Sequence, residues 1–406
     1  MVAHHTTPPT PAAPATGRTS DVLVVGGGIV GLVAAWRAAL LGLSVVCLDP
    51  DPGSGATHAA AGMLAPVTEA TFGEEALTAL CVDSAARWPA FAAELEEASG
   101  LSTGLRTCGT LAVSYDQGDA EQARRMRGLH QRLGLSAEEI TVAEARELEP
   151  FLGPRLSAAY RVSGDHQVDP RATHRALLAA LDRMPHVELR HVAAAEILRS
   201  PSGDVLGAVD VVGERHVAGT TVVAAGVASG DLLRTVPGVD VPVRGVKGQS
   251  IRLDASDQPS FGLRHVVRGT VQMRPVYVVP RPGGEVVVGA TSEERSDHDA
   301  PSAGGVHALL RDARVLVPGI DELAFLEVTA RARPAMPDNL PLLGATDVPG
   351  LVVATGHHRN GILLAPLTAA VLEATLAGVA DGTAPPLPDA VARTDARRFS
   401  RQGVPA

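Results

Sequence analysis

The sequence predicts an α/β protein (α+β overall) in which a discontinuous, mostly parallel α/β domain has a mostly antiparallel β domain inserted into it. A strand–helix–strand unit occupies residues 22–49, and two later strands, near residues 220–226 and 350–356, also end in glycine. Between these pieces, residues 241–288 are rich in the short β-branched runs that are typical of strands. Blocks of one layered α/β domain that lie far apart in the sequence indicate a second domain threaded through the first.

The first strand–helix–strand unit carries the fingerprint of a Rossmann-like dinucleotide-binding domain. An apolar run, residues 22–25, leads into Gly26-x-Gly28-x-x-Gly31, and a second apolar run closes at Asp49, 18 residues after Gly31. The first glycine allows a tight turn, the second lets the backbone approach a pyrophosphate at the helix N-terminus, and the third packs the helix on the strand. The strands and the terminal acid favour a dinucleotide site over a glycine-rich turn of another α/β unit.

The remaining elements follow from apolar periodicity and from helix start signals. Asp169 and Pro170 predict an N-cap and first helical residue, opening a helix that runs to about Leu181. Residues 75–150 look helical, with the strongest segments at 76–98, 120–133 and 142–148. Later strands are expected at 187–198, 205–212, 220–226, 325–333 and 350–356, and later helices at 306–317 and 362–376.

These elements predict the division of the chain into domains. We expect residues 21–95, 160–240 and 330–380 to form the cofactor domain, and residues 96–159 and 241–329 to form the substrate domain. Residues 1–20, composed mainly of Pro, Ala and Thr with a His pair, predict a disordered tail. The Pro-rich residues 381–406 predict a loosely held C-terminal tail.

Composition excludes several classes of partner. The net charge of −10 argues against nucleic acid and anionic membrane surfaces, because both bind basic patches. No apolar run reaches the roughly 18 residues of a membrane span, and the N-terminus lacks the pattern of a secretory signal. Cys47, Cys81 and Cys108 have no metal-ligand spacing, so no metal site is predicted, and so few cysteines suit a reducing cytoplasm.

The segment from Gly356 to Pro366 forms a second strand–glycine–helix junction. A strand runs into Gly356, and a helix is expected to start soon after Gly361, with Pro366 tolerated in its first turn. Backbone amides at this helix start would face an electron-rich group, such as the pyrimidine edge of a reduced flavin. The alternative is an ordinary loop between a strand and a helix.

Three blocks of sequence together resemble the D-amino-acid oxidase family of FAD enzymes: residues 22–49, 55–66 and 356–366. Within that family the chain is most similar to the glycine oxidases of thiamine (thiazole) biosynthesis. The resemblance covers residues 21 to about 378, and residues 276–281, 287–291 and 333–334 match in order. It implies FAD bound in an extended conformation, with the antiparallel domain covering the flavin face.

The resemblance also implies which residues hold FAD. The glycine turn and helix start approach the pyrophosphate, Asp49 binds the ribose, and Ala195 meets the adenine. The loop at residues 59–64 skirts the isoalloxazine, residues 225–226 pass under the cofactor, and residues 356–362 lie near the pyrimidine edge. The expected cofactor-binding residues are Gly26, Gly28, Ile29, Val30, Gly31, Asp49, Ala59, Ala60, Ala61, Gly62, Met63, Leu64, Ala195, Ala225, Gly226, Gly356, His357, Arg359, Asn360, Gly361 and Ile362.

FAD is expected to be bound noncovalently. Some related dehydrogenases link FAD through a histidine at the position that matches Ala59, beside His58. No cysteine follows Cys108, which excludes the C-terminal cysteinyl linkage of monomeric sarcosine oxidases.

For the reaction, the resemblance places Arg333, Tyr277 and Arg359 at the substrate. Arg333 would hold an α-carboxylate in a bidentate pair, Tyr277 would assist it, and Arg359 would lie close by. The family chemistry needs no general base, because a hydride passes from Cα to flavin N5 and the imine then hydrolyses. Arg331 lies on the same side of the strand as Arg333 and is the alternative carboxylate ligand, although the Arg-Pro pair favours Arg333.

The expected activity is the FAD-dependent oxidative deamination of glycine or a similar small amine, with O2 as acceptor. The products would be glyoxylate, ammonia and H2O2, supplying thiazole synthesis, and relatives are often tetramers. Pro275 and Ser292 depart from the family pattern at the pocket, which leaves sarcosine, D-alanine or D-proline as alternative substrates of an oxidase or dehydrogenase. A nonenzymatic FAD-binding subunit is a further alternative, and a nicotinamide-dependent reductase is a weaker one, because only one full fingerprint is visible.

Overall fold

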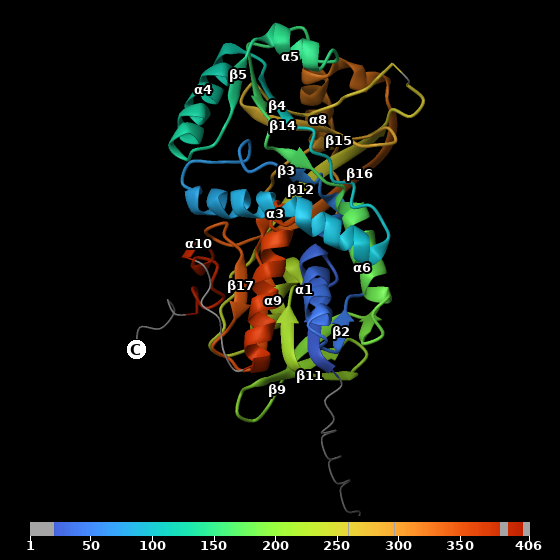
Figure 1. Ribbon diagram of the computed structural model, residues 1–406, viewed down its shortest axis with the longest axis vertical. Helices are drawn as coiled ribbons and strands as arrows, with labels where there is room; N and C mark the ends of the chain where they lie inside the picture. The colour runs from blue at the N-terminus through green and yellow to red at the C-terminus, as the bar shows by residue number, and fades with distance from the viewer. Residues whose placement is uncertain (1–19, 259, 296, 382–388, 401–406) are drawn as a thin grey trace, which may run out of the picture.

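Two eight-stranded sheets organise the molecule, one above the other in Figure 1. The structure, a computed structural model, describes residues 20–258, 260–295, 297–381 and 389–400. The predicted disordered tail therefore lies outside the described residues, except for Ser20, which begins the first strand.

The first sheet is mostly parallel and has the strand order β17-β18-β11-β1-β2-β8, with β10 and β9 added beside β11. Its central strands, β1 (Ser20–Val25) and β2 (Val45–Leu48), are almost wholly buried, as expected for parallel strands covered on both faces. The other strands of this sheet are β8 (Val187–Arg190), β9 (Ala194–Arg199), β10 (Val205–Asp210), β11 (Arg215–Val223), β17 (Leu342–Ala345) and β18 (Leu351–Thr355).

Helices cover this sheet. Helix α1 (Ile29–Leu40) packs between α6 (Pro170–Asp182) and α9 (Ala365–Asp381), and its residues are largely buried. Helix α3 (Glu75–Ser99) contacts α6 and α9 and lies across the molecule between the two sheets (Figure 1). Short elements complete the connections: α2 (Ala56–Ala59), α7 (Ser229–Leu233), and the two-stranded pair of β3 (Met63–Leu64) with β7 (His166–Gln167).

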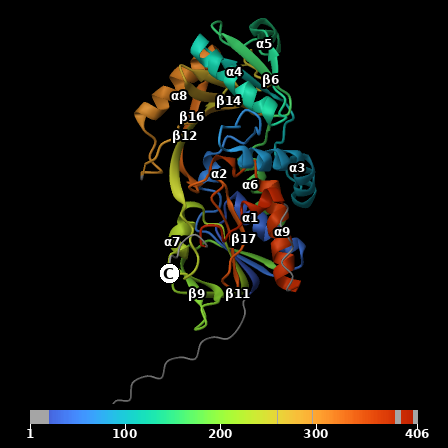
Figure 2. The same cartoon turned by 90° about the vertical axis from the view of Figure 1, so that its left-hand side faces the viewer.

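The second sheet has the order β16-β12-β15-β14-β13-β4-β6-β5, and all its pairs are antiparallel except β13–β4. Helices α4 (Gln117–Arg132), α5 (Val142–Leu148) and α8 (Ala303–Leu316) lie around it (Figure 2). Its strands are β4 (Thr110–Ser114), β5 (Glu138–Ile140), β6 (Ala158–Val162), β12 (Arg244–Asp254), β13 (Val266–Val271), β14 (Arg274–Pro280), β15 (Glu285–Gly289) and β16 (Ala324–Ala335).

The α/β fold class is confirmed, and several local predictions hold. The Asp169 side chain caps α6 by accepting hydrogen bonds from the amides of Arg171 and Ala172, with Pro170 in the first helical position. Helix α5 has the predicted bounds.

Other local predictions are wrong. Strands β4 and β5 interrupt the stretch that looked wholly helical, and the single strand expected at 187–198 is two strands, β8 and β9, in different parts of the first sheet. Two of the expected domain boundaries, at residues 160 and 330, fall inside β6 and β16, which both belong to the second sheet.

The prediction of a loose C-terminal tail is also wrong for its described part. The short helix α10 (Asp389–Ala392) leads to residues that pack on β17, where the Leu343 amide donates to the carbonyl of Thr394 at 2.8 Å. Val391, Thr394 and Ala396 are buried, because this segment covers the free edge of β17. Among the helices of the described residues, none combines the length and the apolar character needed to cross a membrane.

Candidate active site

A cavity of about 720 Å³ lies where the two sheets face each other. One wall is made by the carboxyl ends of β1, β2, β11 and β18, where open α/β sheets bind their ligands, and the other by β12, β14 and β16. Its volume falls in the range of cofactor and substrate pockets, roughly 300–1,000 Å³.

The glycine turn lines one end of this cavity. Gly26 has a φ of +111°, which suits glycine. Gly28 is the N-cap residue of α1, whose first amide, that of Ile29, donates to Oγ1 of Thr57 at 3.0 Å. Ile29 and Val30 in the first turn of this 12-residue helix line the cavity, so the N-terminal end of α1 faces it. Gly31 lies outside the cavity lining, because it packs directly on the carbonyl of Gly26, where a Cβ would overlap the oxygen.

Asp49 is oriented by backbone amides at the same end. One carboxylate oxygen accepts from the Gly27 amide at 2.6 Å and the other from the Asp51 amide at 2.9 Å. The side chain lines the cavity with lone pairs still free, so it can accept hydrogen bonds from ribose hydroxyls.

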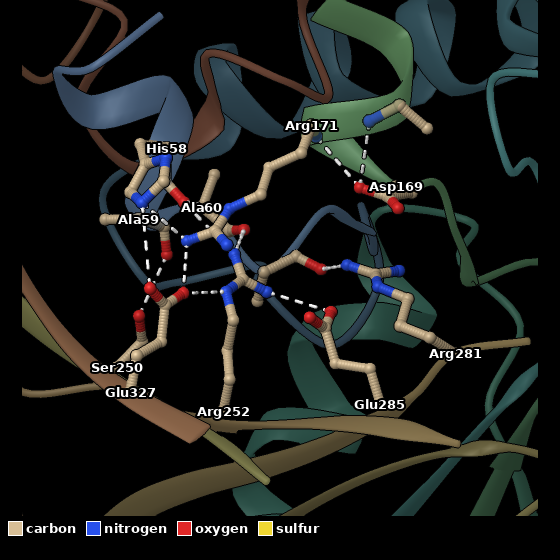
Figure 3. Close-up of polar contacts among 12 residues, drawn as sticks. His58, Ala59, Ala60, Asp169, Arg171, Ser250, Arg252, Arg281, Glu285 and Glu327 are labelled. Carbon is tan, nitrogen blue, oxygen red and sulfur yellow. Dashed lines mark hydrogen bonds and ion pairs between the residues drawn. The ribbon is translucent and has the colours of Figure 1, made fainter. Parts of the chain in front are cut away.

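The loop that follows α2 forms the middle of the cavity wall, from Ala59 to Met63. Behind it lies a charged network between the two sheets, drawn in Figure 3. The network contains Arg171 of α6, Ser250 and Arg252 of β12, Arg281, Glu285 of β15 and Glu327 of β16.

Every backbone carbonyl from His58 to Ala61 accepts a hydrogen bond from this network. Arg171 and Arg252 both donate to the carbonyl of His58, each at 3.1 Å. Ser250 donates to the carbonyl of Ala59 at 3.0 Å, Arg252 reaches that of Ala60 at 3.5 Å, and Arg281 donates to that of Ala61. These hydrogen bonds fix the backbone of residues 58–61, so the loop presents one defined backbone surface to the cavity.

Arg252 is the centre of this network, and its side chain is only 3% exposed. It forms ion pairs with Glu327 at 2.8 Å and Glu285 at 3.1 Å, and Arg171 also pairs with Glu327. Truncating one partner of these ion pairs would leave a buried charge unpaired, which is energetically unfavourable. The pairs therefore hold Arg252 in the position from which it bonds the loop.

We expect Arg252→Met to weaken FAD binding by about 10-fold or more, since a bond from a charged donor contributes about 1.5–3 kcal/mol. Titration of FAD into the apoprotein, followed by quenching of flavin fluorescence, measures the dissociation constant. Arg314→Met is the matched control, because Arg314 is 60% exposed and pairs with Asp321 on α8's outer side. Equal FAD affinity in both variants would contradict a role for the network in shaping the loop.

At the other end of the cavity, Tyr277 of β14 lies beside Arg333 of β16. One guanidinium nitrogen of Arg333 donates to the carbonyl of Thr291 at 3.0 Å and reaches that of Lys247 at 3.5 Å. In the described part of the chain, no carboxylate forms an ion pair with Arg333. Burial lowers the pKa of Arg333 and raises that of Tyr277, so the phenol keeps its proton and is a hydrogen-bond donor.

Two glycines create the space for these side chains. A Cβ on Gly248 would overlap the guanidinium of Arg333, and one on Gly289 would overlap the ring and hydroxyl of Tyr277. Neither glycine was predicted as a site residue, because no local motif marks it.

Arg331 and Arg359 are engaged differently from Arg333. Nε of Arg331 donates to the carbonyl of Ser54 at 2.7 Å, so this side chain is directed to the loop after β2. Arg359 pairs with Glu69 at 2.9 Å and Glu74 at 2.5 Å. Glu69 also pairs with Arg268 of β13, and both line the cavity although neither was predicted.

His357 and His358 line the cavity beside the β18 junction. Burial lowers the pKa of each to about 4, so both are neutral at neutral pH. His357 shares a hydrogen bond with Thr368 at 3.0 Å, whereas Nδ1 of His358 is buried with no partner among the described residues. A neutral histidine with a free ring nitrogen can bond a cofactor or substrate.

The structure brings most predicted site residues to this one cavity, with four exceptions. Gly31 packs on the glycine turn, Leu64 is buried in the core, and Gly356 faces Met336 with a φ of +78°. Ala195 is exposed, and its neighbour Ala194 lines the cavity instead, because alternate residues of a strand face opposite sides.

Asp210, Glu214 and His216 are the one described group that brings three possible metal ligands within 4.8 Å. Asp210 is already engaged, because one oxygen accepts from two backbone amides and the other contacts Nε2 of His216.

The cavity fits FAD along its length. It offers the N-terminus of α1 and a glycine turn for a pyrophosphate, a positioned carboxylate for a ribose, and a wall of small residues for a flat ring. His58, next to this wall, contacts Arg171 through Nε2 at 2.7 Å, so that nitrogen is engaged in the network.

Comparison with known proteins agrees with this fit. The model of the FAD dependent oxidoreductase family matches residues 21–375. The bifunctional protein ThiO/ThiG of Nostoc sp. is 34% identical over 360 residues, covering 87% of this chain and 52% of that protein, so the chain spans about half its length.

Two proteins match over nearly their whole length. The glycine oxidase of Geobacillus kaustophilus is 33% identical over 351 residues, covering 86% of this chain and 90% of that protein. Its crystal structure superimposes with a TM-score of 0.82, covering 93% of this chain and 98% of that one. The iminodiacetate oxidase of Chelativorans sp. BNC1 is 26% identical, with a TM-score of 0.79 and coverage of 92% and 98%.

The fold and the cavity thus define an FAD-binding oxidoreductase. The family match extends over most of the chain, and the glycine oxidase match covers nearly all of a relative above 30% identity. The chain therefore belongs to the D-amino-acid oxidase family of FAD dependent oxidoreductases.

Proposed function

We propose that the protein oxidises glycine, or another small amine with one carboxylate, using O2 as the electron acceptor. The observation that carries this proposal is the partly buried Arg333 side chain, which lines the cavity beside Tyr277 with no carboxylate partner among the described residues. A cation of this kind is stabilised by an anionic ligand. A planar guanidinium and a carboxylate form a bidentate pair, which also sets the direction of the substrate.

Bound FAD supplies the hydride acceptor for oxidation at the Cα of the amine. The residues of the chain then act by positioning: Arg333 holds the carboxylate, and the protonated Tyr277 hydroxyl donates a hydrogen bond to it. Two points of attachment leave the substrate little freedom to rotate, and such orientation is a large part of catalysis in a confined site. The imine product hydrolyses to glyoxylate and ammonia, and reoxidation by O2 yields H2O2.

The relatives support a small amino acid as substrate, since two of them are named glycine oxidase and iminodiacetate oxidase. Pro275 and Ser292 line the cavity but are exposed, so they form its mouth. Because both residues depart from the family pattern, we expect the mouth of the cavity to differ from that of the relatives. Sarcosine, D-alanine and D-proline are therefore the alternative substrates.

The match to ThiO/ThiG leads us to propose that the product supplies thiazole synthesis for thiamine. Three free cysteines are compatible with the cytoplasm, where we place the protein, and we propose a homo-oligomer of the tetrameric kind found among relatives.

Anaerobic reduction of the bound flavin, measured with glycine, sarcosine, D-alanine, D-proline and iminodiacetate, tests the activity. Glycine is expected to bleach the flavin absorbance fastest, and aerobic turnover is expected to release H2O2. If sarcosine or a D-amino acid reduces the flavin faster than glycine does, that amine is the preferred substrate in place of glycine. A flavin that no amine reduces would instead favour a nonenzymatic FAD-binding subunit.

A further inference from the structure

Four arginines line the cavity, and one of them, Arg331, is directed to the carbonyl of Ser54. The other three differ in what neutralises them. Arg333 has no carboxylate partner among the described residues, Arg359 has two, and Arg268 has one. The partner of Arg268, Glu69, is also one of the two partners of Arg359.

Glu69 is shared between the two arginines through different oxygens. Oε1 accepts from Arg268, and Oε2 accepts from Nε of Arg359 at 2.9 Å. Glu74 pairs with Arg359 independently and accepts from Asn339 at 2.7 Å. Loss of the Glu69 charge would therefore leave Arg359 paired, but it would leave Arg268 without a counter-ion.

Arg268 is placed to contact a substrate held by Arg333. It lies directly across from Tyr277 in the β13–β14 pair, where cross-strand side chains are neighbours, and Tyr277 lies beside Arg333. Tyr277 thus stands between two partly buried arginines, of which Arg268 is neutralised by Glu69 and Arg333 has no carboxylate partner among the described residues. Burial and the nearby Arg359 lower the pKa of Arg268 to about 10, so it remains charged at neutral pH.

We propose that Glu69 determines substrate specificity, because it occupies Arg268 and so restricts the site to amines with a single carboxylate. Without this internal counter-ion, Arg268 becomes a second anion site, and the cavity accepts amino dicarboxylates. The inference rests on the proposed function, in which Arg333 holds the first carboxylate. It adds that the enzyme discriminates substrates by the number of their carboxylates, and that Glu69 is the residue responsible.

The physical reason is the cost of an unpaired buried charge. A buried guanidinium that loses its partner is destabilised, and a second carboxylate on the ligand restores the pairing. In the unmodified protein the same carboxylate would meet Glu69, and two carboxylates competing for one arginine repel each other.

Binding of malonate and acetate to the FAD-loaded protein tests the proposal without turnover, with the change in flavin absorbance expected on binding as the readout. In the unmodified protein, malonate is expected to bind no more tightly than acetate. In Glu69→Gln the ratio of malonate to acetate affinity is expected to rise about 10-fold or more. Glu69→Asp, which keeps the charge, is the matched control, and Glu69→Gln combined with Arg268→Gln is expected to abolish the gain.

Turnover provides a second readout with a matched substrate pair. Sarcosine and iminodiacetate are both secondary amines, and iminodiacetate has a carboxylate in place of one hydrogen of the methyl group. The ratio of their kcat/KM values is expected to shift toward iminodiacetate in Glu69→Gln.

Two results would overturn the proposal. One is malonate binding more than 10-fold tighter than acetate in the unmodified protein, which shows the second site already open whether or not the variants fold. The other is an unchanged affinity ratio in a Glu69→Gln protein that retains FAD. If no amine reduces the flavin, the proposed function fails, while the malonate and acetate titrations still report on Glu69.

Discussion

Arg333→Ala is expected to raise the apparent KM for glycine by about 30-fold to 5,000-fold, because truncating one partner of a buried charge pair costs about 2–5 kcal/mol. FAD is expected to stay bound, since the hydrogen bonds of Arg333 go to the backbone at Thr291 and Lys247 and not to the loop of residues 59–63. Anaerobic flavin reduction at increasing glycine concentration gives the apparent KM, and the flavin absorbance spectrum reports cofactor retention.

Arg331→Ala is the matched control, because Arg331 lies two residues away on the same strand, β16, and also lines the cavity. Its Nε donates to the carbonyl of Ser54, so its loss should act on the loop after β2 and leave glycine binding much less affected. Unchanged kinetics in Arg333→Ala would move the carboxylate role to Arg331 or Arg359. Arg359 is the less favourable of these two, because Glu69 and Glu74 already pair with it.

Gly31→Ala is expected to abolish FAD binding. The added Cβ would overlap the carbonyl oxygen of Gly26, and that carbonyl belongs to the backbone, so it cannot rotate away as a side chain would. Helix α1 must then move away from β1, which displaces the first turn of α1 that lines the pyrophosphate end of the cavity. Overpacking of this kind costs about 1–3 kcal/mol or more in stability. The ratio of flavin to protein after purification, together with circular dichroism, measures both effects.

Gly304→Ala is the control for the same chemical change. Gly304 lies in the first turn of α8, and a Cβ there would meet no atom within 4 Å. We expect full FAD content and a Tm that is unchanged or slightly higher, because alanine favours a helix by about 0.4–1 kcal/mol at a compatible site. Stoichiometric FAD with normal affinity in Gly31→Ala would show that the close approach of α1 and β1 is unnecessary.

Some misses have a common physical cause. Strands β4 and β5 are short and lie between helices, so their periodicity is weak, and their partners β13 and β6 are distant or follow later in the chain. Such pairing joins segments that no short stretch of the sequence contains, so local periodicity does not reveal it. The adenine contact at Ala195 stays a prediction, and its neighbours Ala193 and Ala194 line the cavity.

The glycine turn, the Asp49 acid and the Asp169 cap were predictable because each depends on residues close together in the sequence. The sequence by itself thus determined the dinucleotide end of the cavity, and through its resemblance, the flavin and Arg333 with Tyr277. Only the tertiary structure decided how the charges at the substrate end are paired. Glu69 is separated from Arg268 by 199 positions and from Arg359 by 290, and Gly248 makes room for a guanidinium on another strand. Such contacts depend on which strands and loops adjoin in space, and spacing along the chain does not encode that directly.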